Sequence, residues 1–275
     1  MKRARLLVAL AGAVVFVVSA SPLGAADPSV ILATTTSTQD TGLLDVLVPA
    51  FEQASGYRVK VIAVGTGAAL AMGTRGDADV LLVHAPEAEA AYMASGRGRS
   101  RAAVMHNAFI VVGPAGDPAH VRGDASAGDA FAKIARSGAP FVSRADDSGT
   151  DKKEHALWKA AGIEPSASAY VKTGSGMADT LHIAAQKRAY ALTDDGTYLA
   201  QRPTLDLVAL VEGAPDLANP YHVIVVEPIA GHLANPAGGE AFARYVVSES
   251  GQRLIANFGR EKYGRPLFVP DARPR

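Results

Sequence analysis

Cysteine is missing from all 275 residues of this chain. Its absence excludes disulfide bonds, zinc sites built on thiolates and a catalytic thiol. The seven histidines are scattered, and no pair has the His-Glu-x-x-His spacing of a zinc enzyme. We therefore assign the histidines to core or surface positions, and we predict neither a metal-cation site nor a cofactor.

Net charge is missing as well, because 27 Lys and Arg residues balance 27 Asp and Glu residues. Nucleic-acid-binding proteins show a basic excess, so we expect no nucleic-acid partner. The composition, 48% hydrophobic and 20% charged, is that of a globular protein. The length suits one large domain or two smaller ones.

Long apolar runs are confined to the N-terminus. A basic stretch, "MKRAR", precedes the apolar run "LLVALAGAVVFVVSA", and "PLGAAD" then supplies small residues for cleavage. This order predicts a signal peptide over residues 1–26, with a short uncleaved membrane anchor as the alternative. Its removal leaves 24 basic against 27 acidic residues, so we expect a mildly acidic exported protein.

Strand-like and helix-like segments alternate along the rest of the chain. The predicted strands are 29–34, 57–64, 79–83, 108–113, 140–143, 189–194, 205–211 and 222–227. The predicted helices are 40–56, 67–76, 86–96, 128–138, 151–162, 177–188 and most of 236–259. Such alternation predicts an α/β fold with a mostly parallel sheet, in one sheet or in two lobes.

The signatures of common enzymes are incomplete. Lys172, Thr173 and Gly174 spell a motif of penicillin-interacting enzymes, but no Ser-x-x-Lys supplies the nucleophile. The chain has neither a Gly-x-Ser-x-Gly elbow nor the Gly-Lys pair of a P-loop. We expect that the chain is not an enzyme, and an exported hydrolase is the alternative from another functional class.

Small and hydroxyl-bearing residues gather at four junctions where a helix begins. The junctions are "TTTS" at 34–37, "GTG" at 65–67, "SRADDSGT" at 143–150 and "GSG" at 174–176. A helix N-terminus carries unpaired N–H donors and partial positive charge, which together attract anions. Helix capping explains any one junction, but a cap needs a single hydroxyl. Because such loops meet at the carboxyl ends of the strands, we expect a pocket of donors there.

Arg144 is the one strong cation inside these motifs. It can pair with Asp146 or Asp147, or its planar fork can clamp a doubly charged tetrahedral oxyanion. The two roles are compatible, since a neighbouring carboxylate can orient the guanidinium. The aspartates also bear on the choice of anion: a monoprotonated phosphate needs an acceptor, whereas a carboxylate repels a fully ionised anion.

Five segments together resemble a known family. They are "ILATTTSTQDTGLLDVLVPAFEQASGYRVKVIAVGTGAAL", "DVLLVHAPEAE", "PFVSRADDSGTDKKEHALWKAAGIEP", "ALTDDGTYLA" and "LVEGAPDLANPYHVIVV". Their order resembles that of the periplasmic tungstate-binding proteins of Tup-type ABC transporters, over nearly the whole chain after residue 26. Each motif alone is weak, but "TTTS", "HAPEAE" and "SRxDDSGT" in this order are specific.

The resemblance implies a type II periplasmic binding protein fold, which has two α/β lobes with a ligand cleft between them. The chain would cross between the lobes near 107–112 and return near 221–226. The first lobe would then comprise 27–107 plus 223–275, and the second lobe 108–222.

The resemblance also implies a set of oxyanion contacts. They are Thr35, Thr36, Ser37, Thr66, Arg144, Ser148, Thr150, Ser175 and Gly176. Two positions depart from the family pattern: Ala145 stands where glycine is usual, and Asp151 where histidine is usual. We expect Asp151 to face solvent.

The implied function is that of a periplasmic receptor. It would capture tungstate, or molybdate, and deliver it as a monomer to a membrane permease driven by an ATPase. A molybdate or phosphate receptor on the same fold is the alternative, as is an extracytoplasmic sensor module. An acceptor from Asp146 or Asp147 inside the cleft would favour phosphate.

Overall fold

The computed structural model describes residues 29–272 except 164 and 230–234. The predicted signal peptide lies outside these residues. Within the part described, no helix is both long enough and apolar enough to span a membrane.

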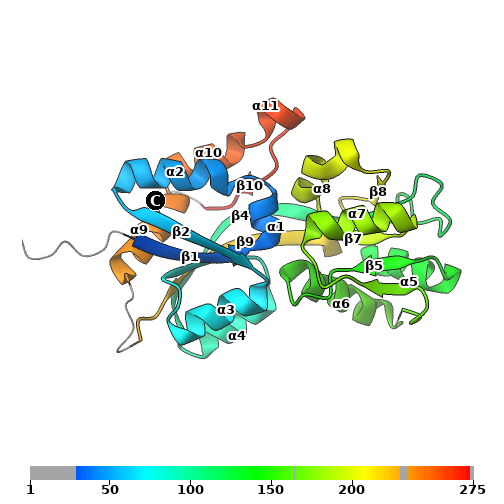
Figure 1. Cartoon of the computed structure of the whole chain (residues 1–275), viewed down its shortest axis with the longest axis horizontal. Helices are drawn as coiled ribbons and strands as arrows, with labels where there is room; N and C mark the ends of the chain where they lie inside the picture. The colour runs from blue at the N-terminus through cyan, green and yellow to red at the C-terminus, as the bar shows by residue number, and fades with distance from the viewer. Residues whose placement is uncertain (1–28, 164, 230–234, 273–275) are drawn as a thin grey trace, which may run out of the picture.

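Two α/β lobes lie side by side (Figure 1). The first contains β1 (Ser29–Thr35), α1 (Thr36–Asp40), α2 (Leu44–Ser55), β2 (Arg58–Val64), α3 (Thr66–Arg75), β3 (Val80–Val83), α4 (Pro86–Ala94), β9 (Ala218–Val226), α9 (Pro236–Val246), α10 (Glu249–Asn257), α11 (Arg260–Tyr263) and β10 (Val269–Pro270). The second contains α5 (Ala127–Ser137), β5 (Phe141–Ser143), α6 (Gly149–Ala161), β6 (Tyr170–Lys172), α7 (Met177–Lys187), β7 (Ala191–Asp194), α8 (Asp195–Gln201) and β8 (Val208–Val211). The long strand β4 (Gly98–Gly113) belongs to both.

The predicted α/β class is confirmed, but the prediction of a mostly parallel sheet is wrong. The first lobe orders its strands β10-β4-β9-β3-β1-β2, and only β1 with β2 and β1 with β3 are parallel there. β9 runs against β3 and β4, and β4 also runs against β7, β8 and β10. The strands that connect the lobes therefore oppose their neighbours, which local periodicity does not show.

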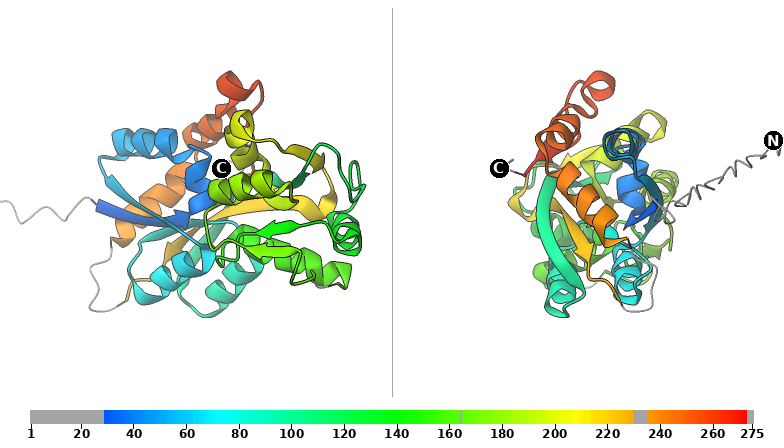
Figure 2. Two further views of the ribbon diagram at one scale, coloured as in Figure 1. Left: turned by 45° about the vertical axis from the view of Figure 1, so that its right-hand side comes forward. Right: turned by 90° about the vertical axis from the view of Figure 1, so that its left-hand side faces the viewer.

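Both faces of each sheet are covered by helices. In β1, Val30 and Leu32 pack with α2, α9 and α10, whereas Ala33 packs with α3 and α4. In the second half of β4, Phe109 packs with α5 and α6, whereas Ile110 packs with α7 and α8. This alternation follows from the two-residue period of a strand. Figure 2 shows the helices on opposite sides of the strands.

The predicted helix over 236–259 is two helices. Ser248 caps α10, because its hydroxyl oxygen accepts a hydrogen bond from the Gly251 N–H at 3.2 Å. A β-carbon at Gly251 would collide with the Tyr245 carbonyl oxygen, so glycine permits the close turn. The break lets α9 and α10 both cover the same face of the first sheet.

The exchange between lobes occurs within β4. Residues 98–108 pair with β9, and residues 109–112 pair with β7. Residues 218–222 also pair with β4 or β3 in the first sheet, although we assigned them to the second lobe. The pairing therefore favours a return to the first lobe before Ala218, and the exact lobe limits stay a proposal.

Candidate functional site

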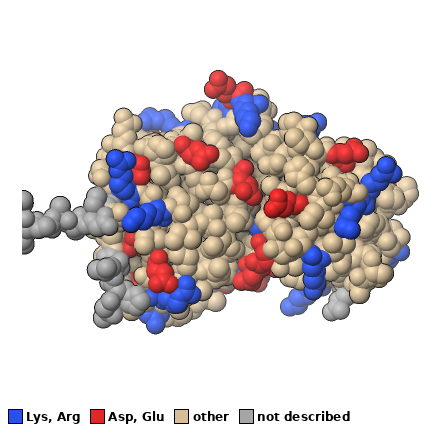
Figure 3. All heavy atoms as spheres, viewed as in Figure 1, with Lys and Arg blue, Asp and Glu red and all other residues tan. Residues whose placement is uncertain are grey.

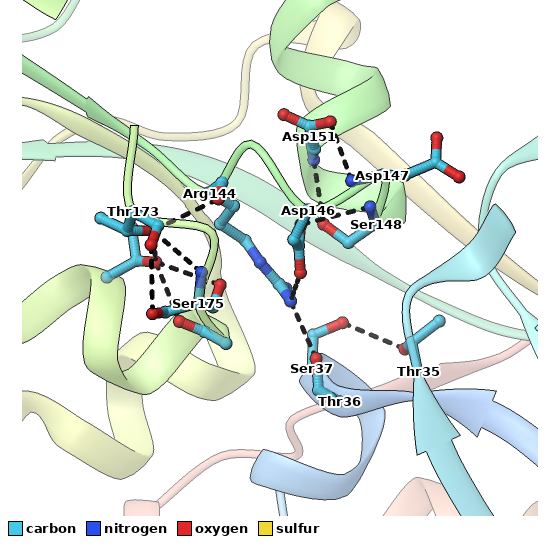
Figure 4. Close-up of polar contacts among 12 residues, drawn as sticks. Thr35, Thr36, Ser37, Arg144, Asp146, Asp147, Ser148, Asp151, Thr173 and Ser175 are labelled. Atoms are coloured by element: carbon cyan, nitrogen blue, oxygen red, sulfur yellow. Dashed lines mark hydrogen bonds and ion pairs between the residues drawn. The ribbon is translucent and has the colours of Figure 1, made fainter. Parts of the chain in front are cut away.

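Loops from both lobes meet at the boundary between them. From the first lobe come residues 35–37, at the end of β1, and residues 65–67, after β2. From the second come residues 144–150, which follow β5 and include the start of α6. Three longer helices, α3, α6 and α7, begin at three of the hydroxyl-rich junctions. Figure 4 shows the side chains of this region.

Two glycines allow the loops to approach. A β-carbon at Gly65 would lie 2.8 Å from the carbonyl oxygen of Asp146, and one at Gly67 would collide with the Asp147 carboxylate. The Gly67 N–H also donates to the Asp147 carbonyl oxygen at 3.3 Å. The "GTG" junction therefore serves contact between the lobes.

Arg144 lies at the centre and only 1% of its surface is exposed. Its Nη2 donates to the Asp146 carboxylate at 2.5 Å and to the Thr36 hydroxyl oxygen at 2.8 Å. Nε and Nη1 of the same guanidinium have no partner among the described residues. The carboxylate thus orients the guanidinium and leaves two of its donor atoms for a ligand (Figure 4).

Two hydroxyls among the predicted contacts have the same property. Thr66 Oγ1, at the start of α3, and Thr150 Oγ1, in the first turn of α6, are buried without a partner in the described structure. An unpaired buried polar atom costs about 1–3 kcal/mol. Such atoms, together with Nε and Nη1 of Arg144, fit a site that donates hydrogen bonds to a ligand.

Ser148 is the N-cap of α6. Its hydroxyl oxygen accepts from the Asp151 N–H at 3.2 Å, and its own N–H donates to Asp146 Oδ1 at 3.2 Å. Both carboxylate oxygens of Asp146 are therefore occupied, one by Ser148 and one by Arg144. The Asp147 side chain is 65% exposed and pairs with Lys152. Neither aspartate offers an unoccupied acceptor beside Arg144.

Asp151 does not face solvent, so that expectation is wrong. The residue is 7% exposed, and its carboxylate accepts from the N–H groups of Ala145 at 3.1 Å and Asp147 at 3.2 Å. Both of those residues have left-handed backbone conformations, with φ of 49° and 58°. Asp151 therefore holds a strained loop in place, and the strain explains why glycine is favourable at position 145.

In the "GSG" loop, the Ser175 side chain bonds to a neighbouring residue and not to the guanidinium of Arg144. The Ser175 hydroxyl donates to the carbonyl oxygen of Thr173 at 3.4 Å, and its N–H donates to the Thr173 hydroxyl at 3.2 Å. Gly176 is the N-cap of α7 and lies against the carboxylate of Asp40 from α1. Burial raises the pKa of Asp40, while Arg144 and the Ala178 N–H oppose the shift.

Sequence reasoning missed Asp40 and underestimated His84. His84 directly follows β3, is 2% exposed, and lies 3.1 Å from the hydroxyl oxygens of both Thr35 and Ser37. Burial lowers the pKa of His84 to about 4, so its ring is neutral at neutral pH. His84 lies beside the motif "TTTS" because β1 and β3 pair in parallel, and this pairing is not evident from the sequence.

The positive charge of the site is not displayed on the surface. Along the lobe boundary, the face in Figure 3 shows several acidic groups and little basic surface. Arg144 is enclosed by contacts from both lobes, including the one to Thr36. In this arrangement of the lobes the guanidinium is therefore closed off from solvent.

The arrangement suits binding of a small anion. Around Arg144 the donors are hydroxyls and a guanidinium, and both carboxylate oxygens of Asp146 are engaged. Two further carboxylates, Asp40 and Asp194, interact electrostatically with Arg144. Within the described residues, no group of three His, Asp or Glu side chains could hold a metal ion.

Known proteins share both this sequence and this fold. Residues 23–250 match the PBP superfamily domain. The tungstate-binding protein TupA of Peptoclostridium acidaminophilum is 48% identical over 246 residues, which cover 89% of this chain and 86% of that protein.

Two solved structures are similar. The tungstate ABC transporter structure from Geobacter sulfurreducens has a TM-score of 0.77 and 42% identity, over 85% of this chain and all of the other. The tungstate-binding protein TupA from Desulfovibrio alaskensis G20 has a TM-score of 0.71 and 42% identity, over 90% of this chain and all of the other.

These likenesses define the class of protein. The chain belongs to the PBP superfamily and has a periplasmic binding protein fold of two α/β lobes. Within that superfamily, it belongs to the family of TupA tungstate-binding proteins.

Proposed function

We propose that this protein is the extracytoplasmic binding component of an ABC importer and that its ligand is tungstate. The observation that carries the proposal is the group of buried, unpartnered donors around Arg144, namely its Nε and Nη1, Thr66 Oγ1 and Thr150 Oγ1. A tetrahedral dianion supplies acceptors for all of them. Two relatives of this chain are named tungstate-binding proteins, which agrees with this chemistry.

The proposed contacts retain the nine predicted residues with one refinement. Thr36 and Ser37 approach from the first lobe, Arg144 and Thr150 from the second. The hydroxyl oxygen of Thr35 already has Ser37, Thr38 and His84 as partners. Thr35 therefore positions its neighbours and does not contact the anion through its hydroxyl. Ser148, Ser175 and Gly176 contribute through the loops that open α6 and α7.

The engagement of Asp146, the carboxylate next to Arg144, disfavours phosphate. Hydrogen phosphate must donate its own proton, and both oxygens of Asp146 are already engaged. Sulfate has no proton, but its shorter bonds leave donors short of their acceptors, at a cost of about 1–3 kcal/mol for each unmet hydrogen bond. Tungstate and molybdate are nearly equal in size, so we place molybdate second.

The two lobes suggest how the anion is captured and delivered. The open protein captures the anion on one lobe, the other lobe closes over it, and the loaded form docks on a membrane permease driven by an ATPase. We propose that the mature chain acts in the periplasm as a monomer after loss of residues 1–26, and that it catalyses no reaction.

Calorimetric titration of the ligand-free mature protein tests the proposal. Tight binding of tungstate, weaker or equal binding of molybdate, and no heat from sulfate or phosphate would support it. Binding of phosphate alone would make this a phosphate receptor. Absence of binding to all four anions would overturn the proposed function.

Substitution of Arg144 is the sharper test of the site. Arg144→Ala should weaken tungstate binding at least a hundredfold, because a buried charge-assisted pair is lost. Arg136→Ala is the matched control, since Arg136 is an exposed residue of α5 and should change little. Equal losses in the two variants would show that the anion binds elsewhere.

A further inference from the structure

His84 is the end of a buried chain of hydrogen bonds that reaches across the lobe boundary. Its Nδ1 lies 2.9 Å from Asn219 Oδ1. Asn219 Nδ2 donates to Asn107 Oδ1 at 2.7 Å, and Asn107 Nδ2 donates to Asp194 Oδ1 at 3.3 Å. All of these residues except His84 lie on the connecting strands β4 and β9 or at the end of β7. This series of hydrogen bonds therefore joins the proposed anion site to the second lobe.

Asp194 determines which group donates and which accepts in each of these hydrogen bonds. Its Oδ1 also accepts from the Thr197 N–H at 2.8 Å, so this oxygen is an acceptor. Asn107 must then donate to it, which leaves the carbonyl of Asn107 to accept from Asn219. The carbonyl of Asn219 in turn accepts from His84, which places the ring proton on Nδ1.

The opposite nitrogen of His84 is consequently an acceptor. Nε2 lies 3.1 Å from both Thr35 Oγ1 and Ser37 Oγ, and it can accept a hydrogen bond from either hydroxyl. Thr35 Oγ1 has further partners in the N–H and the hydroxyl of Thr38, at 3.2 and 2.7 Å. Ser37 Oγ has only Thr35 and His84 as partners within the described residues. Ser37 is thus the hydroxyl of this pair with capacity left for a ligand.

Packing holds the ring in place from both lobes. His84 stacks on Tyr221 of β9, with ring centroids 4.6 Å apart and planes 21° apart. A β-carbon at Gly149 would lie 2.7 Å from His84 Cε1, so the start of α6 packs closely against the ring. These two contacts restrict the position of the ring.

We propose that His84 is a positioning residue for anion binding. Asn219, Asn107 and Asp194 hold it in the Nδ1–H form, so that Nε2 accepts a hydrogen bond from the Thr35 hydroxyl and the Ser37 hydroxyl donates to the anion. This inference rests on the proposed function, because it assigns a role within the same oxyanion site. It makes Ser37 a donor and so favours fully ionised anions over protonated ones.

The form of the ring can be measured in the wild-type protein. In a long-range ¹H–¹⁵N correlation spectrum at pH 7, His84 should show a protonated Nδ1 and an unprotonated Nε2. The signal is assigned by its loss in His84→Gln. A protonated Nε2 would overturn the inference. The form of the ring is read in the wild-type protein, and a variant is needed only to assign the signal.

Binding measurements then test the consequence. We expect His84→Phe, which keeps the ring but removes Nε2, to weaken tungstate binding about tenfold, the effect of one lost orienting hydrogen bond. His84→Gln, whose amide oxygen can accept, should recover part of the loss. His182→Gln on α7 is the control and should bind as wild type.

A double-mutant cycle links His84 to Ser37. If His84 acts through Ser37, Ser37→Ala should cost much less affinity in the His84→Phe background than in wild type. Additive losses, or full affinity in His84→Phe, would overturn the role of His84 while leaving the proposed function intact. A wild-type protein that binds no tungstate would instead overturn the proposed function.

Discussion

At the scale of single residues, the loop that carries Arg144 combines strain with compensation. Ala145 and Asp147 both adopt left-handed backbone conformations, and Asp151 binds the N–H groups of both. A carboxylate at position 151 therefore stabilises the loop from behind, without touching the donors that face the proposed ligand.

The strain at Ala145 leads to a stability prediction. Ala145→Gly should raise the free energy of unfolding by about 1 kcal/mol, because glycine adopts φ of 49° without a side-chain clash. The control is Ala160→Gly on the exposed side of α6, which should lower it by about 1 kcal/mol. Urea unfolding measures both, and equal destabilisation would show that position 145 is not strained.

At the scale of elements, the start of α3 is built for contact with the second lobe. Gly65 and Gly67 face the same loop but meet different atoms, the backbone oxygen of Asp146 and the side chain of Asp147. The backbone of Asp146 cannot move without shifting Arg144. The Asp147 side chain, in contrast, is mostly exposed and can rotate away.

The two glycines should therefore respond differently to alanine. Gly65→Ala should weaken tungstate binding about tenfold or more, since overpacking costs about 1–3 kcal/mol and arises only when the lobes meet. Gly67→Ala should have a much smaller effect. Calorimetry on both variants decides, and a larger loss in Gly67→Ala would contradict this account of closure.

At the scale of the whole molecule, the two lobes meet around buried groups that titrate. Burial lowers the pKa of His84 to about 4, against an ordinary value of 6.5 in the unfolded chain. Between these values the unfolded state binds the proton and the folded state does not. The contribution of His84 to stability is therefore lost as pH falls from 6.5 to about 4.

This shift predicts the acid sensitivity of the fold. From pH 7 to pH 4, wild type should lose roughly 3 kcal/mol more unfolding free energy than His84→Phe, which has no group to titrate there. The difference between the two proteins cancels the other titrating groups, such as Glu154, whose pKa burial raises to about 7. Parallel pH profiles would show that His84 is not a buried neutral ring.

Much of the element pattern could be predicted from the sequence, since helix and strand periodicity and caps are local. The strands over 29–34 and 79–83 and the helices over 128–138 and 177–188 were predicted to within about a residue or two of β1, β3, α5 and α7. Strand β4 was predicted only over its last six residues, 108–113, because the strand begins with charged and small residues that lie mostly at the protein surface.

The sequence by itself determined the α/β class, the four hydroxyl-rich junctions and the family, because all of these depend on neighbours along the chain. Only the tertiary structure decided the antiparallel pairing of β4 and β9, the burial of Asp151 and the contact of His84 with Thr35. The contact between Arg144 and Thr36 joins residues 108 positions apart. Such contacts depend on how the two lobes pack, and no local pattern encodes the distance between two lobes.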